Sequence, residues 1–200
     1  PTAIHVSAAL AVRDGLLPAM ARLAAAIEGK ASEVGGQVKA GRTHLMDALP
    51  VTFGQEMRAW RSQVMDAAAR TDAALAGLCR LALGATAVGT GVNAHPEFAG
   101  RAIGRLAART GLAFSGAPDR FASLAAQDGA VQLSACLRGA AVVLLKIGND
   151  LRWMNSGPLA GLVEVSLPAL PPGSSIMPGK ANPVIPEAAA MAATQLLVHD

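Results

Sequence analysis

Apolar side chains recur every three or four residues along three long stretches of the chain, a spacing typical of the buried face of an α-helix. The first stretch runs from about residue 2 to residue 34, and Pro18 lies inside it. Because proline lacks a backbone N–H, we expect a kink near Pro18, and we expect Gly35-Gly36 to end the helix. The apolar stripe of this helix consists of Leu17, Met20, Ala24, Ile27, Ala31 and Val34.

A second stripe predicts a helix that begins near Pro50 or Val51 and ends at about Leu83. Its members are Met57, Trp60, Val64, Ala67, Thr71, Leu75 and Leu78. The third stretch is the most regular, because its apolar residues alternate steps of four and three, as in the seam of a helical bundle. That seam consists of Leu133, Leu137, Ala140, Leu144, Ile147, Leu151 and Met154. We expect Gly157-Pro158 to end this helix.

Glycine, proline and serine gather in the connections between these stretches. The expected loops span residues 37–50, 84–91 and 111–118. A longer segment, residues 157–186, should lack regular structure except for a short strand at residues 163–167 (VEVSL). Shorter helices are expected from Pro96 to Thr110 and from near Pro186 toward the C-terminus.

Composition favours helices over sheets. Only 3% of the residues are aromatic and tyrosine is absent, whereas strands are enriched in aromatic residues. The hydrophobic fraction of 52% and the charged fraction of 16% exclude an ordinary disordered chain. We therefore expect an all-α fold, a bundle of long helices that forms one domain over residues 1–200. Three long helices with irregular connections make a thin bundle, so we also expect a homo-oligomer that covers their apolar faces.

Charge, hydropathy and cysteine content indicate which binding partners and which cellular compartment to expect. The formal net charge is +3 and few aromatic residues lie among the scattered basic ones, so we expect no nucleic-acid partner. The longest uncharged apolar run surrounds residues 140–145 and is far shorter than the roughly 20 residues that span a bilayer, so we expect no membrane partner. Cys79 and Cys136 show neither a zinc spacing nor a disulfide framework, which favours the reducing cytoplasm.

Polar residues gather in two connections. The first runs from Gly41 to Asp47 and holds Thr43 and His44. A histidine in a loop can act as a general acid or base, although a lone histidine is more often structural.

The second polar connection runs from Gly173 to Pro183, and its hydroxyl, ammonium and amide groups belong to Ser174, Ser175, Lys180 and Asn182. A cation beside hydroxyls and a neutral amide suits a small anionic substrate. An Ω-loop built from ordinary turn residues is the alternative interpretation. Glu187 follows just beyond this connection.

The second connection, GSSIMPGKANP, is similar to the signature GSSxMPxKxNP of the fumarase/aspartase superfamily. Further segments that resemble this family are residues 41–56 (GRTHLMDALP followed by GQE), 84–93 (GATAVGTGVN) and 146–153 (KIGNDLRW). The resemblance implies an all-α homotetramer whose subunits pool their long helices in one core and whose active sites form where three subunits meet. It also implies a small dicarboxylate substrate and reversible anti-elimination to give fumarate, with no metal or organic cofactor.

The same resemblance implies a role for each motif residue. Ser174 would be the base that removes the Cβ proton, and His44, paired with Glu187, would serve the leaving group or its activating water. The residues expected to bind substrate are Thr43, Lys180, Asn182, Ser175, Gln55 and Asn93.

Within the superfamily, fumarate hydratase is the favoured activity and aspartate ammonia-lyase is the alternative. Residues 95–98 (HPEF) and 120–139 look more like class II fumarase, whereas residues 84–86 and 182–187 look more like aspartase.

Two departures from the family pattern bear on activity. Leu159 stands where the family usually has arginine, and leucine cannot replace a guanidinium. Family members are also much longer, so the chain resembles their central helical domain without the parts before Pro1 and after Asp200. A catalytically incomplete helical assembly fragment is therefore a further alternative.

Overall fold

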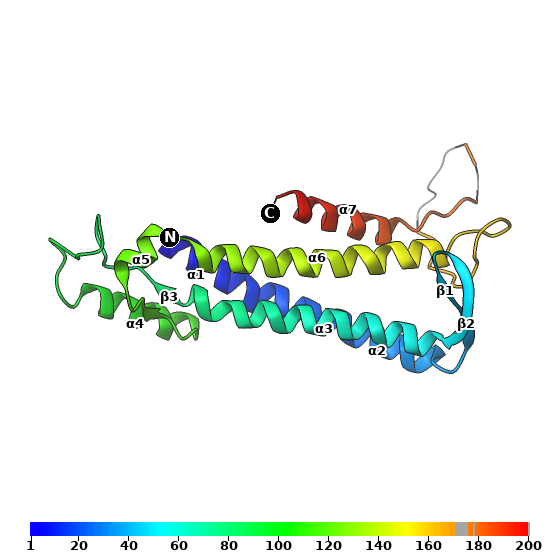
Figure 1. Cartoon of the computed structure of the whole chain (residues 1–200), viewed down its shortest axis with the longest axis horizontal. Coiled ribbons are helices and arrows are strands. Elements are labelled where there is room, and N and C mark those ends of the chain that lie inside the picture. Colours follow the sequence, from blue (N-terminus) through cyan, green and yellow to red (C-terminus); the bar gives the residue numbers. More distant parts are fainter. Residues whose placement is uncertain (171–175, 178, 200) are drawn as a thin grey trace. The chain divides into compact units, whose positions relative to one another are not determined.

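Most of the regular structure is helical in the computed structural model, which describes residues 1–170, 176–177 and 179–199 (Figure 1). The helices are α1 (Thr2–Ala11), η1 (Val12–Leu16), α2 (Leu17–Val34), α3 (Phe53–Leu78), α4 (Phe98–Thr110), α5 (Arg120–Ala125), α6 (Asp128–Met154) and α7 (Val184–Val198). The strands are β1 (Val38–Thr43), β2 (Met46–Thr52), β3 (Arg80–Leu81) and β4 (Ser115–Gly116). The expected all-α class is confirmed.

The first long helix is continuous but distorted. α1, η1 and α2 follow one another without a break, and η1 is a turn of π-helix. Pro18 follows it by two residues and has no N–H to donate to the carbonyl of Asp14, so the α-helical ladder is interrupted there. The expected irregularity near Pro18 is thus a π-helical turn, and the helix ends at Val34, as expected.

The predicted apolar stripes are the buried faces of the helices. In α3, every stripe residue from Met57 to Leu78 is buried. In α6, the buried seam residues lie seven positions apart and are Leu133, Ala140, Ile147 and Met154. This heptad spacing of buried positions agrees with a bundle seam.

The expected loop at residues 37–50 contains a β-hairpin, so that prediction was wrong. β1 and β2 pair antiparallel, with Val38 opposite Thr52 and Thr43 opposite Met46. The two-residue turn between them, His44-Leu45, has φ angles of 50° and 63°, as a type I′ turn requires. Asn-Gly or Asp-Gly usually signals such a turn, and His-Leu does not.

Helix α3 ends at Leu78 and not near Leu83, because the residues that follow it pair with a later segment. The carbonyl of Cys79 accepts a hydrogen bond from Ser115 N, and the carbonyl of Leu81 accepts one from Ala117 N, both at 2.9 Å. β3 and β4 therefore form a short parallel pair, β3 within the expected end of the helix and β4 within the expected loop at residues 111–118.

Residues 163–167 form no strand, contrary to expectation. The backbone N–H groups of Glu164 and Val165 both donate to the carbonyl of Met154, at 2.8 and 3.1 Å. The segment thus folds back onto the C-terminal end of α6 and satisfies a carbonyl that the helix leaves unpaired. The two shorter helices are confirmed as α4 and α7.

Contacts divide the chain into two compact units. The first comprises residues 1–21 and 68–136, and the second comprises residues 22–67 and 137–200. The second unit holds the hairpin, the segment after α6, and α7, together with every predicted site residue that the structure describes except Asn93. The assignment of residues 1–200 to a single domain stays a prediction.

Two glycines allow close backbone approaches in the second unit. α7 lies along α6 (Figure 1), and a Cβ atom on Gly148 of α6 would lie 3.0 Å from the carbonyl oxygen of Pro186. At the base of the hairpin, a Cβ atom on Gly54 would lie 2.8 Å from Cα of Gly35. The first approach brings the start of α7 close to α6, and the second brings the two segments that flank the hairpin together at its base.

Helix α6 is long and apolar enough to cross a membrane. An 18-residue window has a mean hydropathy of 1.6, and 22% of that window is buried. The core helix of a soluble protein meets the same criteria of length and composition, so these do not separate the two cases. The buried heptad seam of α6 favours a packed core helix.

Candidate functional site

A cleft of about 390 Å³ opens beside the β-hairpin and is called the hairpin cleft below. The hairpin, α3, the end of α6 and the segment after it all contribute to its wall. The charged and imidazole side chains that line it are Lys39, Arg42, His44, Glu56, Lys146, Asp150 and Glu164. His44 lies in the turn between the strands and is exposed, and Thr43 is the exposed last residue of β1.

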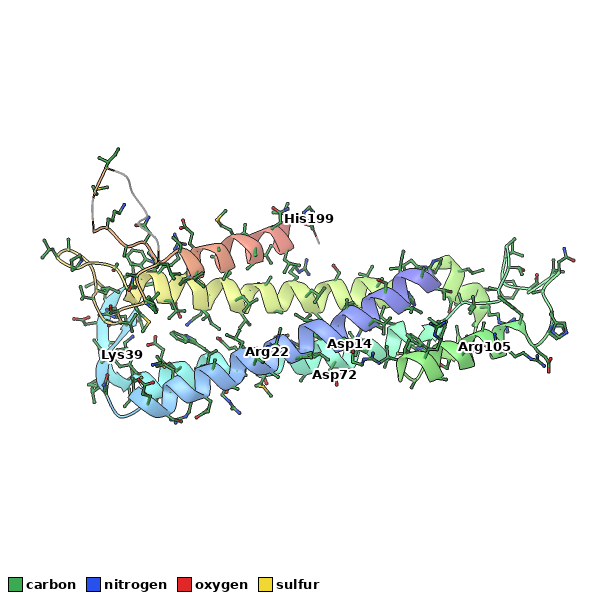
Figure 2. All side chains as sticks on the ribbon, turned by 180° about the vertical axis from the view of Figure 1, so that it is seen from behind. Asp14, Arg22, Lys39, Asp72, Arg105 and His199 are labelled. Atoms are coloured by element: carbon green, nitrogen blue, oxygen red, sulfur yellow. The ribbon has the colours of Figure 1, made fainter. Side chains whose placement is uncertain are left out.

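Four charged side chains in this wall form an ion cluster, made of Lys39, Arg42, Glu56 and Glu164. Lys39 Nζ lies 2.6 Å from Glu56 Oε2 and 2.9 Å from Glu164 Oε2. Arg42 Nη1 donates to Glu164 Oε1 at 2.5 Å. The side chains of Lys39 and Glu164 are only 7% and 10% exposed. Figure 2 shows Lys39 on the hairpin.

The cluster favours the charged forms of its buried members. Burial by itself would raise the pKa of Glu164, but hydrogen bonds from Lys39 and Arg42 outweigh burial and lower that pKa. Burial would likewise lower the pKa of Lys39, but hydrogen bonds to Glu56 and Glu164 raise it. Lys39 and Glu164 therefore both stay charged at neutral pH.

A second polar group joins α3 to α6 in the wall of the hairpin cleft. Lys146 Nζ pairs with Asp150 Oδ2 one helical turn later, and Trp60 Nε1 of α3 donates to the same oxygen at 3.1 Å. Lys146 Nζ also lies 5.7 Å from the centre of the Trp60 ring. These contacts hold the Asp150 carboxylate in a fixed position.

Lys180 and Asn182 line a second cavity of about 420 Å³, called the signature cavity below. Asn149 and Arg152 of α6 and Asn155 just after it share the same wall. Arg152 Nη1 donates to Asn149 Oδ1 at 3.1 Å. Two cations and three side-chain amides thus face one space, which suits an anion with several carboxylate oxygens.

Glu187 lies in the first turn of α7 and is exposed in a groove between α6 and α7. His44 lines the hairpin cleft, so the two predicted partners line different cavities of the chain. Among the described residues, no hydrogen bond or ion pair joins His44 to Glu187. Their pairing stays a prediction for an assembly of several subunits.

Gln55 has a structural role at the start of helix α3. Gln55 Oε1 accepts a hydrogen bond from Thr52 N at 2.9 Å, and Thr52 Oγ1 accepts one from Gln55 N at 3.1 Å. This reciprocal pair is a capping box at the start of α3. Asn93 lies in the first unit, in the loop before α4, with φ 65°. The substrate-binding roles of both residues stay predictions.

Ser174 and Ser175 lie outside the described residues, so their roles as base and substrate ligand stay predictions. Within the part of the chain that the structure describes, no group of three or more His, Cys, Asp or Glu residues could hold a metal ion. Cys79 and Cys136 are free thiols.

Lys39, Arg152 and Glu164 are among the residues of these cavities that were not predicted as site residues. The sequence held a signal for Glu164, because it is the only charged residue in the VEVSL segment. Arg152 lies inside the KIGNDLRW segment that resembles the family, but its residue type alone did not separate it from surface arginines.

Comparison with known proteins extends over the whole chain. The sequence model of the lyase family matches residues 1–197. The fumarate hydratase class II of Xylella fastidiosa (strain 9a5c) is 56% identical over 199 residues, which are 100% of this chain and 42% of that protein. The fumarate hydratase class II 2 of Pseudomonas aeruginosa is 55% identical over 200 residues, 100% of this chain and 44% of that protein. The chain thus spans less than half the length of these relatives.

Solved structures agree with this match. The class II fumarase of Schistosoma mansoni has a TM-score of 0.95 and is 37% identical, and the match covers 99% of this chain and 44% of that one. The cobalt-bound fumarate lyase:delta crystallin of Brucella melitensis has a TM-score of 0.93 at 40% identity, over 99% of this chain and 43% of that one. Because the family match and these relatives cover nearly every residue, the chain belongs to the fumarase/aspartase superfamily of lyases.

Proposed function

We propose that the protein containing this chain is a fumarate hydratase of class II, which interconverts L-malate with fumarate and water. The observation that carries the proposal is the signature cavity, where Lys180, Arg152 and Asn182 face one space. Malate and fumarate are dicarboxylates, and cations beside amides suit carboxylate oxygens. Relatives 55–56% identical over the whole chain that bear the name fumarate hydratase class II support this substrate class.

Lys180 and Asn182 bind the carboxylate next to the carbon that loses its proton. When the Cβ proton leaves, negative charge moves from that carbon onto the carboxylate oxygens. A fixed ammonium group and an amide N–H stabilise this charge more strongly in the transition state than in bound malate, which lowers the barrier.

Ser174 accepts the Cβ proton as an alkoxide, and the hydroxyl group leaves from the neighbouring carbon. His44, oriented by Glu187, gives that hydroxyl a proton so that it departs as water. The Cα–Cβ bond becomes double, and no electron carrier is needed. The proton on Ser174 then returns to His44 through solvent, which restores both groups for the next turnover.

The active assembly is a homotetramer, as the family resemblance implies. The placement of His44 and Glu187 in different cavities of one chain supports a site that several subunits share. Large apolar side chains on α6 and α7 support such an assembly. Val142 and Met191 are 54% and 67% exposed, and neighbouring subunits would cover them. The two free thiols support a cytoplasmic location.

The experiment that tests the function uses the chain alone and a hybrid enzyme. In the hybrid, this chain replaces the matching 199 residues of the Xylella fastidiosa relative, which supplies the flanking segments. Each purified protein is mixed with L-malate or L-aspartate, fumarate is followed by ultraviolet absorbance, and mass is measured by light scattering.

We expect the hybrid to be a tetramer that forms fumarate from L-malate and not from L-aspartate. Fumarate from L-aspartate alone would overturn the hydratase assignment in favour of an ammonia-lyase. A tetrameric hybrid that turns over neither substrate would overturn the proposal in favour of an assembly fragment. The native relative, measured beside the hybrid, shows that the assay detects hydration.

A further inference from the structure

One buried carboxylate holds both cations of strand β1. Glu164 Oε1 accepts from Arg42 Nη1 at 2.5 Å, and Glu164 Oε2 lies 2.9 Å from Lys39 Nζ. Arg42 directly precedes Thr43 and His44 in the sequence. A displacement of the Arg42 backbone is therefore passed on to the two residues that follow it.

The turn that carries His44 has few other contacts. The side chains of Leu45 and Met46 are 72% and 71% exposed. Within the described residues, the His44 side chain makes no hydrogen bond or ion pair. The backbone pairing of β1 with β2, in which Thr43 lies opposite Met46, and the ion cluster at the base of the turn are thus the contacts that hold Thr43 and His44.

Glu164 is itself fixed to helix α6. Its backbone N–H donates to the carbonyl of Met154, the last residue of α6, at 2.8 Å. The same end of α6 provides Arg152 to the signature cavity. Glu164 therefore links the end of α6 to the strand that carries His44.

We propose that Glu164 is a positioning residue for the reaction, which acts through Arg42 and Lys39 to hold Thr43 and His44 in place relative to the end of α6. This inference rests on the proposed function, because it assigns the contact to the placement of His44. Glu164 faces the two cations and is not itself a catalytic residue.

Replacement of Glu164 by glutamine keeps the side-chain size and removes the charge. Lys39 would keep Glu56, 2.6 Å away. Of the carboxylates that the structure describes in an ion pair with Arg42, Asp47 would remain; its Oδ1 lies 3.7 Å from Arg42 Nε and its side chain is 82% exposed. We therefore expect Arg42 to move toward Asp47 at the open side of the hairpin and to carry Thr43 and His44 with it.

The test measures steady-state kinetics of L-malate conversion in the hybrid enzyme. Glu164→Gln should lower kcat by up to about 100-fold, since misplaced reacting groups cost up to that factor. KM should rise by a smaller factor, because Thr43 moves with His44 while Lys180 and Asn182 stay in place. Glu164→Asp, which keeps the charge, should recover part of kcat. The matched control is Glu33→Gln, which removes an exposed partner of Lys30 in α2 and should leave kcat and KM unchanged.

A second variant covers the case in which Glu164→Gln fails to fold. Arg42→Lys keeps the charge but loses the planar fork, and it should lower kcat in the same way. In the chain alone, amide hydrogen exchange of β1 and β2 should be faster in both variants than in Glu33→Gln, whereas exchange in α3 should not change. Amide hydrogen exchange can be measured whether or not the protein converts L-malate.

Different results would contradict the positioning role of Glu164 and the proposed hydratase function. A wild-type hybrid that does not convert L-malate would contradict the function, while the exchange experiment would still test the link to the hairpin. An active wild-type hybrid, together with folded Glu164→Gln and Arg42→Lys variants whose kcat stays within about twofold of wild type, would overturn the positioning role alone.

Discussion

Arg42 Nη1 lies 2.5 Å from Glu164 Oε1, although 122 positions separate the two residues in the sequence. Lys39 shares the same carboxylate, and the side chains of Lys39 and Glu164 are both almost fully buried. Removing one partner of a buried ion pair leaves the other charge without compensation, which typically costs about 3–5 kcal/mol. The charge state of this cluster should therefore affect the stability of the second unit.

We expect the free energy of unfolding to decrease as the pH falls below about 4.5. The pKa of Glu164 is lower in the folded chain than its ordinary value of 4.5. Its stabilising contribution is therefore fully present above that value and is lost as the pH falls through the folded pKa, because the unfolded carboxyl takes up its proton first. Urea unfolding of the wild type and Glu164→Gln at several pH values measures this. The variant should show a smaller loss of stability on acidification.

Lys39 should give the opposite dependence at high pH. Its pKa is raised above the ordinary value of 10.5 in the folded chain. Its contribution is present below 10.5 and is lost as the pH rises through the folded pKa. Lys39→Met should remove this alkaline decrease. Lys30→Met, at an exposed ion pair in α2, is the control and should keep the wild-type alkaline decrease. Equal alkaline curves for wild type and Lys39→Met would contradict the expectation.

Gly148 should be intolerant of any larger side chain. A Cβ atom there would lie 3.0 Å from the backbone oxygen of Pro186 and 3.6 Å from Cβ of Ala190. Because backbone cannot move as a side-chain tip can, Gly148→Val should separate α7 from α6 and lower stability by about 1–3 kcal/mol. Thermal unfolding followed by circular dichroism measures the change.

Gly139 offers a control in the same helix. A Cβ atom at Gly139 would meet nothing within 4 Å. Gly139→Ala should therefore raise stability by about 0.5–1 kcal/mol, the usual gain of alanine over glycine inside a helix. If Gly148→Val and Gly139→Ala lowered stability equally, the close approach of α6 to α7 at Gly148 would not be the cause of the loss in Gly148→Val.

The capping box at the start of α3 raises the question of whether Gln55 stabilises the helix end or binds substrate. If Gln55 serves the helix end, Gln55→Ala should lower stability by about 0.5–1 kcal/mol, as Thr52→Ala should, and leave KM for L-malate unchanged in the hybrid. Gln63, which is exposed further along α3, provides the control substitution Gln63→Ala. A raised KM at full stability would instead support the predicted contact with substrate.

Helix positions could be predicted because burial imposes a period of 3.6 residues on the sequence. All seven stripe residues of α3 are buried, and Pro18 marked the distortion near η1. The hairpin could not be predicted, because His44 and Leu45 adopt left-handed conformations in which glycine or asparagine is usual. The end of α3 was misplaced because β3 pairs with β4, a contact more than thirty residues away that local pattern does not contain.

Site residues that lie in short sequence motifs could be predicted, whereas contacts between residues far apart in the sequence could not. Lys180, Asn182 and Thr43 lie in contiguous motifs with a family resemblance. Glu164 looked like part of an apolar strand, and its partners Lys39 and Arg42 are far away in sequence. Only the folded chain brings a charge in one segment to the cations of another.

Arg152 should contribute to substrate binding in the signature cavity. Its guanidinium shares that cavity with Lys180 and Asn182 and is held toward Asn149. Loss of a charge-assisted hydrogen bond costs about 1.5–3 kcal/mol, so Arg152→Gln should raise KM for L-malate in the hybrid by about 10-fold to 100-fold. Arg152→Lys should recover only part of this affinity, because an ammonium group lacks the bidentate fork.

The matched control is Arg101→Gln. Arg101 lies in α4 and forms an exposed ion pair with Glu97, so its replacement should leave KM unchanged. Initial rates of fumarate formation over a range of malate concentrations give both constants. An unchanged KM in Arg152→Gln would remove Arg152 from the substrate site and leave the carboxylates to Lys180 and Asn182.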